Sequence, residues 1–214
     1  MTIWAILPVK PIRNGKSRLS GVLSENQREA LNLRMFENTL TILCEIEKIE
    51  KILVVSRDSG VLAYARNHGA HTIQEDSDSE LNLALKRATI VTKNYSVNSL
   101  LILPADLPLL QAEDLEKIID VDASKKMMVI VPDRRMEGTN VLFLQQVEEF
   151  DYLFGQNSFQ FHVQQGIEKG FETVTIINER LGLDLDFPED IEYLKQVSPL
   201  SHEHFLHIQE TYQM

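Results

Sequence analysis

Four basic side chains fall within nine positions near the start of this chain: Lys10, Arg13, Lys16 and Arg18. The chain as a whole carries a formal net charge of -11 at pH 7. A local group of cations in an acidic protein favours a small anionic ligand such as a phosphate. A solvated basic loop is the alternative, and the place of the loop in the fold decides between the two.

Two acidic segments offer complementary chemistry. Asp106 lies between Pro104 and Pro108, directly after an apolar run, and Asp184 and Asp186 are two residues apart. In an extended backbone alternate side chains point to the same side, and two adjacent carboxylates repel each other unless a cation lies between them. A turn cap would explain Asp106 and chance would explain the pair, but together the three acids favour a hard cation such as magnesium.

Two further segments combine glycine with small polar side chains. They contain Thr139, in the tripeptide GTN, and Gly155 and Ser158, in FGQNSF. Gly155 permits a close approach of backbone, and Ser158 is placed to cap a helix whose free amides would receive an anion. A plain turn before a capped helix explains both equally well. We expect His162 on that helix to be packed or solvated rather than catalytic.

Strand-like and helix-like runs alternate along the chain, which predicts a single α/β domain of three layers around a mostly parallel sheet. The expected strands are Thr2–Leu7, Lys51–Ser56, His71–Gln74, Ser99–Leu103, Met127–Val131, Asn140–Leu144 and Thr173–Ile177. The expected helices are Glu25–Glu47, Ser59–Asn67, Leu81–Val91, Ala112–Ile119, Phe159–Lys169 and Pro188–Gln196. The alternation weakens after about residue 135, so we expect an antiparallel strand or hairpin in the second half. The basic loop and Asp106 would both follow strands, where open α/β sheets bind ligands.

The length of 214 residues fits one domain, which we place at residues 1–196, with a tail or short helix over 197–214. The acidity argues against binding of nucleic acid or of an anionic membrane. No apolar run approaches the length of a membrane span, and the amino terminus lacks the pattern of a signal peptide. We therefore expect a soluble, cytoplasmic protein.

Two features favour a structural role over a chemical one. Cys44, the only cysteine, continues an apolar helical stripe, so we expect a buried thiol. His202, His204 and His207 have a spacing that imitates metal ligands, but nothing in the sequence orders them around one point.

Five motifs occur in this order over roughly residues 3–191: LPVKPIRNGKSRL, LPADLPLL, GTN, FGQNSF and LDLDFPED. Together they resemble the phospholactate guanylyltransferase family of deazaflavin coenzyme F-420 biosynthesis, whose members have a nucleotide-diphospho-sugar transferase (GT-A-like) fold. The resemblance implies a magnesium-dependent transfer of GMP from GTP to a small phosphorylated carboxylic acid, with release of pyrophosphate. That acid would be 2-phospho-L-lactate, phosphoenolpyruvate or 3-phospho-D-glycerate, which the sequence does not distinguish.

The resemblance also implies residue roles. The GTP would be bound by Lys10, Arg13, Lys16, Arg18, Asn82 and Asp106, with Asn82 reading the nucleobase. The catalytic residues would be Lys16, Arg18 and Asp106. The magnesium would be held by Asp106, Asp184 and Asp186, and the phosphorylated acid would be contacted by Thr139, Gly155 and Ser158. The chain departs from the family pattern at Glu80, Glu137 and Phe187.

Other functions of the same fold stay open at this point. Sugar-nucleotide pyrophosphorylases and molybdopterin nucleotidyltransferases have a glycine-rich first loop, whereas Gly15 is the single glycine here. A glycosyltransferase would more often carry its paired acids in mid-chain. A non-catalytic nucleotide-binding protein would be expected to lose the acids at 106, 184 and 186, which are present. The sequence leaves the oligomeric state open, with a homodimer as one candidate.

Overall fold

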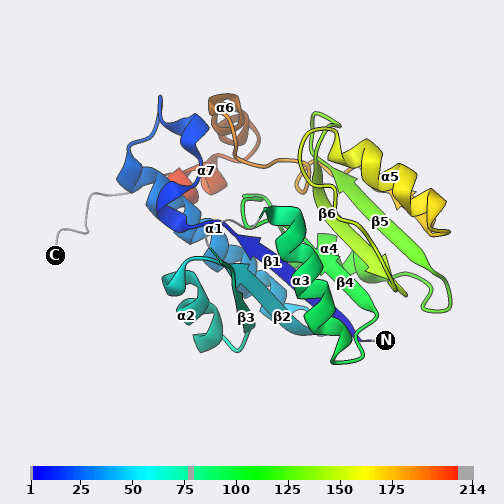
Figure 1. Cartoon of the computed structure of the whole chain (residues 1–214). Coiled ribbons are helices and arrows are strands. Elements are labelled where there is room, and N and C mark those ends of the chain that lie inside the picture. Colours follow the sequence, from blue (N-terminus) through cyan, green and yellow to red (C-terminus); the bar gives the residue numbers. More distant parts are fainter. Residues whose placement is uncertain (1, 77–79, 207–214) are drawn as a thin grey trace.

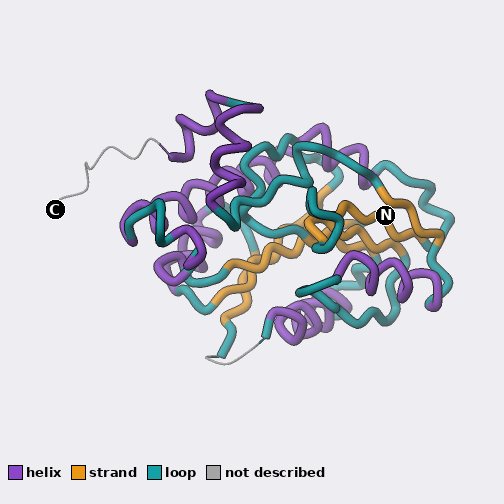
Figure 2. Tube along the Cα trace, turned by 90° about the horizontal axis from the view of Figure 1, so that it is seen from above, coloured by secondary structure: helices purple, strands orange, loops and turns teal. Residues whose placement is uncertain are grey.

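A computed structural model describes residues 2–76 and 80–206. Seven strands form one sheet in the order β3-β2-β1-β4-β6-β5-β7, with helices on both of its faces (Figures 1 and 2). The strands are β1 (Ile3–Val9), β2 (Ile49–Ser56), β3 (His71–Gln74), β4 (Ser99–Ile102), β5 (Met127–Pro132), β6 (Thr139–Gln145) and β7 (Glu172–Thr175). The seven expected strands are thus confirmed to within about two residues at each end.

The sheet is mixed, as expected from the weaker alternation in the second half. Strands β1, β2, β3 and β4 run parallel to one another, and β7 runs parallel to β5. Strand β6 is antiparallel to both β4 and β5. The start of β6 therefore lies at the same edge of the sheet as the carboxyl ends of β1, β4 and β5, and that edge gathers the sequence motifs.

The helices are α1 (Glu25–Glu45), α2 (Ser59–Asn67), α3 (Leu81–Lys93), α4 (Ala112–Ile119), α5 (Ser158–Glu168), α6 (Pro188–Val197) and α7 (Pro199–Leu206). Two short 3-10 helices, η1 (Ile12–Asn14) and η2 (Ser17–Leu19), shape the basic loop. The six expected helices are present, and α7 agrees with the expected terminal helix. His202 and His204 lie on α7, whereas His207 falls outside the described residues.

Two cores cover the two faces of the sheet. On β1 the side chains of Ala5 and Leu7 pack with α1, α2 and α4, while Trp4 and Ile6 pack with α3 and with aromatic residues near α5. A strand that is apolar on both faces is typical of the centre of a parallel α/β sheet. The three-layer prediction is confirmed.

A third, smaller core lies beside the sheet and supports the acidic motif. Leu183 and Leu185 are fully buried there, against side chains of α1, α6 and α7. Because side chains alternate in an extended segment, Asp184 and Asp186 point the other way. The alternation predicted from the sequence thus places both carboxylates on one side.

The expectation for Cys44 was wrong. The apolar stripe of α1 continues to Leu43 and then to Ile46 in the following loop, which are both buried. Cys44 lies on the exposed side at the end of the helix, with its Sγ atom 4.0 Å from the carbonyl oxygen of His68. Among the helices of the described chain, none combines the length and apolar character that a bilayer span requires.

Candidate active site

The basic loop is fixed to its neighbours through the backbone of Ile12. Its N–H donates to Asp58 Oδ2 at 3.1 Å, and its carbonyl oxygen accepts from Asn32 Nδ2 at 2.8 Å. Four residues later, Lys16 has a left-handed backbone conformation with φ 55°. For a non-glycine residue this conformation costs about 1–2 kcal/mol, and such outliers gather at functional sites. The loop is therefore built to hold Lys16 in one direction.

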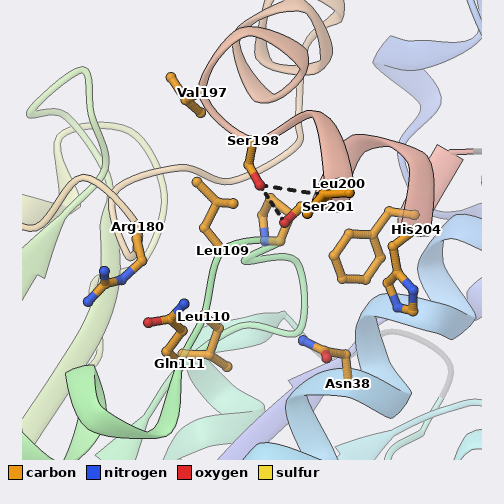
Figure 3. A pocket seen from close by; sticks show the side chains of 12 residues that line it. Asn38, Leu109, Leu110, Gln111, Arg180, Val197, Ser198, Leu200, Ser201 and His204 are labelled. Carbon is orange, nitrogen blue, oxygen red and sulfur yellow. Dashed lines mark hydrogen bonds between the residues drawn. The ribbon is translucent and has the colours of Figure 1, made fainter.

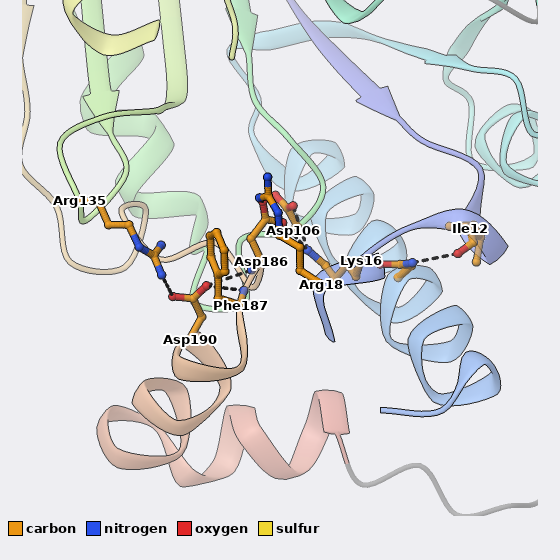
Figure 4. Close-up of polar contacts among 9 residues, drawn as sticks. Ile12, Lys16, Arg18, Asp106, Arg135, Asp186, Phe187 and Asp190 are labelled. Atoms are coloured by element: carbon orange, nitrogen blue, oxygen red, sulfur yellow. Dashed lines mark hydrogen bonds and ion pairs between the residues drawn. The ribbon is translucent and has the colours of Figure 1, made fainter. Parts of the chain in front are cut away.

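The Lys16 ammonium lies between two of the expected site acids. Its Nζ atom is 3.0 Å from Asp106 Oδ2 and 3.4 Å from Asp186 Oδ1, and Arg18 Nη1 is 3.3 Å from Asp186 Oδ2 (Figure 4). Burial lowers the pKa of Lys16, but Asp106 and Asp186 outweigh that effect and raise the pKa above its ordinary value. The lysine is thus a fixed positive charge at the carboxyl ends of β1 and β4.

Asp184 is the acid that lacks compensation. Its Oδ1 atom is buried and has no hydrogen-bond partner within the part of the chain that the structure describes. Burial, together with repulsion from Asp106 and Asp186, raises the pKa of Asp184 to about 7. A buried carboxylate without a partner is costly, so the site suits a further cation.

The buried side chain of Asp190 holds the backbone of the acidic segment, and two arginines in turn hold Asp190. Asp190 is fully buried on the first turn of α6 and accepts from the backbone N–H groups of Asp186, at 3.1 Å, and Phe187, at 2.7 Å. Its other oxygen accepts from Arg134 at 2.9 Å and Arg135 at 2.7 Å. The sequence alone did not predict the contacts of Asp190 with these two arginines.

Phe187 places two guanidinium groups beside the acids. The Cζ atoms of Arg18 and Arg135 each lie 4.8 Å from its ring centroid, a cation–π arrangement (Figure 4). The departure from the family pattern at this position therefore has a structural use, since the ring restrains Arg18 next to Asp186.

The tripeptide GTN connects the acidic segment to the sheet. Asn140 Nδ2 donates to the carbonyl oxygen of Leu181 at 2.8 Å. The backbone N–H of Arg134 donates to the carbonyl oxygen of Gly182, also at 2.8 Å. A Cβ atom at position 182 would lie 2.9 Å from the carbonyl oxygen of Asn178, so only glycine fits there. These contacts bring the start of β6 next to the acidic motif.

Thr139 and Ser158 form a buried polar pair at the start of β6 and α5. Their hydroxyl oxygens are 3.3 Å apart, and Thr139 Oγ1 is 3.0 Å from His162 Nδ1. Ser158 is the first residue of α5 and not its cap, because Asn157 precedes the helix with φ 59°. Gly155 has φ 133°, a conformation that other residues rarely adopt, which explains the glycine in FGQNSF.

Three residues that were expected to bind GTP are exposed or have other partners in the structure. Lys10 is exposed, and Arg13 forms a surface ion pair with Glu29 at 3.2 Å. Asn82 uses its amide on the backbone of Phe154, since Nδ2 donates to the carbonyl oxygen at 3.1 Å and Oδ1 accepts from the N–H at 2.8 Å. The Asn82 amide thus holds the backbone of Phe154, and its contact with the nucleobase stays a prediction.

The donor chemistry at the three acids fits a magnesium ion. Carboxylate oxygens are ligands that magnesium prefers, and the unpartnered Oδ1 of Asp184 faces no competing hydrogen-bond donor in the described chain. Within residues 2–76 and 80–206, no three histidine, cysteine or carboxylate side chains lie close enough to hold an ion as they stand. The Lys16 ammonium instead bridges Asp106 and Asp186.

Asp184→Asn is expected to stabilise the metal-free protein above pH 7. Because the folded pKa of Asp184 is raised, to about 7, wild-type stability is lost as pH rises from the unfolded pKa of about 3.9 through the folded value. The side-chain amide of the Asp184→Asn variant does not ionise in this pH range, so the variant avoids that loss of stability. Allowing for partial solvent exposure, we expect a gain of about 1–2 kcal/mol, or roughly 2–8 °C in Tm.

Thermal unfolding in a chelator at pH 5 and pH 8 measures this effect. The gain should be larger at pH 8 than at pH 5. Asp120→Asn is the control, because the pKa of Asp120 is lowered by Lys48 and its loss brings no gain. An Asp184→Asn variant that is no more stable than wild type at pH 8 would contradict the strain assigned to this carboxylate.

An open groove elsewhere on the molecule does not overlap this site. It lies between α7, α1 and the segment before α4 (Figure 3). Its lining includes Asn38, Gln111 and His204, and it contains none of the expected site residues. Asp106 lies instead in the loop after β4, and Asp184 and Asp186 lie in the segment before α6, next to Lys16 in the loop after β1.

Comparisons with known proteins point to one family. The sequence matches the family described as "Guanylyl transferase CofC like" over residues 3–198. It is 34% identical over 195 residues to the phosphoenolpyruvate guanylyltransferase of Rubrobacter xylanophilus, covering 91% of this chain and 94% of the relative. It is 33% identical over 187 residues to the 2-phospho-L-lactate guanylyltransferase of Methanocaldococcus vulcanius, covering 87% and 81%.

Solved structures support the fold. A protein from Desulfovibrio desulfuricans, described as a nucleotide-diphospho-sugar transferase, superposes with a TM-score of 0.76 at 15% identity, covering 97% of this chain and 95% of the other. A cytidylyltransferase from Leptospira borgpetersenii gives a TM-score of 0.60 at 17% identity over the full length of both chains. At such low identity the likeness shows the fold alone.

Proposed function

The chain belongs to the family of CofC-like guanylyl transferases, and from that membership we propose how its residues perform the reaction. It is a guanylyltransferase of deazaflavin coenzyme F-420 biosynthesis that uses phosphoenolpyruvate or 2-phospho-L-lactate. We propose that a phosphate oxygen of the acid attacks the α-phosphorus of GTP. The bond from that phosphorus to the β-bridging oxygen breaks, and pyrophosphate leaves.

The observation that carries the assignment of the site is the position of Lys16 between Asp106 and Asp186, with Arg18 beside them. Two unit charges about 4 Å apart repel by about 4 kcal/mol at an effective dielectric of about 20. GTP and a phosphorylated acid therefore need cations to meet. Lys16 and Arg18 would bind the triphosphate and stabilise the charge that develops on pyrophosphate.

Asp106, Asp184 and Asp186 would hold magnesium. The ion would supply positive charge to the triphosphate and to the leaving pyrophosphate. The proposal is supported by the unpartnered Oδ1 of Asp184 and by the hard oxygen donors of all three side chains. Asp106 and Asp186 would then exchange their contacts with Lys16 for contacts with the ion, which would free the ammonium for the phosphates.

No side chain has to remove a proton from the nucleophile. The second pKa of a phosphate monoester is about 6, so the attacking oxygen is ionised at neutral pH. Positioning and electrostatics would then account for catalysis, as in phosphoryl transfer generally. This agrees with a site whose polar residues are acids, cations and hydroxyls.

The acceptor would lie beside Thr139, Gly155 and Ser158. We expect Ser158→Ala to raise the KM for the phosphorylated acid about tenfold or more, because a hydrogen bond to an anion is worth about 1.5–3 kcal/mol. The KM for GTP should change little. Steady-state kinetics with each substrate varied in turn measure both constants.

Ser124→Ala is the matched control, since Ser124 bonds only Asp122 in a surface turn, and it should change neither constant. A Ser158→Ala variant with a raised KM for GTP and an unchanged KM for the acid would show that the pocket belongs to the nucleotide.

Pyrophosphate release tests the proposed function. The protein is incubated with magnesium, each nucleoside triphosphate in turn, and phosphoenolpyruvate, 2-phospho-L-lactate or 3-phospho-D-glycerate. We expect release with GTP together with one of these acids and little release without an acid. Equal release in the absence of any acid would contradict guanylyl transfer and favour hydrolysis.

A further inference from the structure

His162 is fully buried on α5, yet both of its ring nitrogens have polar partners. Nε2 lies 2.9 Å from the backbone nitrogen of Leu153, and Nδ1 lies 3.0 Å from Thr139 Oγ1. The ring packs edge-on against Phe154, with centroids 4.8 Å apart. The reaction described above uses no histidine, so these contacts need a separate explanation.

The partners fix the position of the ring hydrogen. The backbone N–H of Leu153 can only donate, so Nε2 must accept and carries no hydrogen. A neutral imidazole then has its hydrogen on Nδ1 and donates it to Thr139 Oγ1. Burial lowers the pKa of His162 to about 4, which agrees with a neutral ring at neutral pH.

The hydrogen on Nδ1 determines what the neighbouring hydroxyls can do. Thr139 and Ser158 have two hydroxyl hydrogens between them, and the 3.3 Å contact from Ser158 to Thr139 uses one. Because Nδ1 of His162 donates to Thr139 Oγ1, neither hydroxyl hydrogen is spent on the ring. One hydroxyl hydrogen therefore remains for a ligand outside it.

We propose that His162 is a positioning residue that turns a hydroxyl hydrogen of the Thr139–Ser158 pair toward the phosphorylated acid. The inference rests on the proposed function, which places the acid at this pair. An anion is bound by hydrogen-bond donors and repelled by lone pairs. Without a donor at the Nδ1 position, nothing fixes the rotation of the Thr139 hydroxyl, and the pair no longer holds a hydrogen toward the acid.

Two substitutions separate the two contacts of the ring. In His162→Asn the side-chain amide lies near the position of Nδ1 and keeps a donor for Thr139. In His162→Gln the amide reaches the position of Nε2 and keeps a partner for Leu153 only. We expect His162→Gln to raise the KM for the acid about ten- to a hundredfold, and His162→Asn to restore most of that loss. In both variants kcat and the KM for GTP should stay near wild type.

His68→Gln, on the surface at the end of α2, is the control and should leave all constants unchanged. Nitrogen NMR of the wild-type protein gives an independent readout, because protonated and unprotonated ring nitrogens have distinct chemical shifts. We expect hydrogen on Nδ1 of His162 and none on Nε2.

Hydrogen on Nε2, or an equal KM for the acid in the two His162 variants, would overturn this inference while the proposed function stood. A wild-type protein that used none of the acids would overturn both. The NMR result keeps the test independent of whether either variant folds.

Discussion

Asp106→Asn is expected to lower magnesium-dependent guanylyl transfer at least about a hundredfold, and Asp184→Asn should do the same. A neutral amide is a poor ligand for a hard cation, and loss of the charge stabilisation that a metal supplies costs several kcal/mol in the transition state. Each 1.36 kcal/mol is tenfold in rate. Initial rates at saturating GTP and acid, over a range of magnesium concentrations, measure the effect.

Asp120→Asn is the matched control, because Asp120 forms an exposed ion pair with Lys48 far from the site and should retain wild-type rates. Each variant is first shown to be folded by its circular dichroism and Tm. A folded Asp106→Asn or Asp184→Asn protein with a near-normal rate would remove that residue from the metal site.

Lys16→Ala should lower single-turnover rates at saturating GTP about ten- to a hundredfold, and Arg18→Ala should act in the same direction. Only interactions that strengthen in the transition state speed the chemical step, and a charge-assisted contact is worth about 1.5–3 kcal/mol. The buried lysine should matter more than the exposed arginine, because solvent screens Arg18.

Lys125→Ala serves as the control, since Lys125 pairs with Glu172 on the surface at the far edge of the sheet. Rates for Lys16→Ala and Arg18→Ala equal to that of Lys125→Ala would contradict a role in stabilising pyrophosphate. A loss seen only below saturating GTP would limit both residues to binding.

The architecture could be predicted from the sequence because its signals are local. Strand β1 is a run of apolar and β-branched residues, and α1 begins with a capping box in which Ser24 and Gln27 bond each other. Asp184 and Asp186 alternate with leucines, so their common side follows from strand geometry alone. The proline-flanked Asp106 could be placed at a strand end for the same reason.

Contacts between distant segments could not be predicted in this way. Asp190 finds Arg134 and Arg135 across more than fifty positions, and the amide of Asn82 meets Phe154 across 72. Composition does not encode such pairs. His162 was expected to be packed or solvated, and it is packed, but its two hydrogen bonds depend on the turn at Leu153 and on the register of β6.

Family membership and the position of Lys16 among the acids both support an attack by the acid's phosphate on the α-phosphorus of GTP. Labelling the phosphate oxygens of phosphoenolpyruvate with oxygen-18, then separating the products for mass spectrometry and phosphorus NMR, tests it directly. The account predicts a guanylylated acid that retains the label, including in the new bridge between the two phosphorus atoms, and unlabelled pyrophosphate. Label in the pyrophosphate, or a product without a labelled bridge, would contradict it.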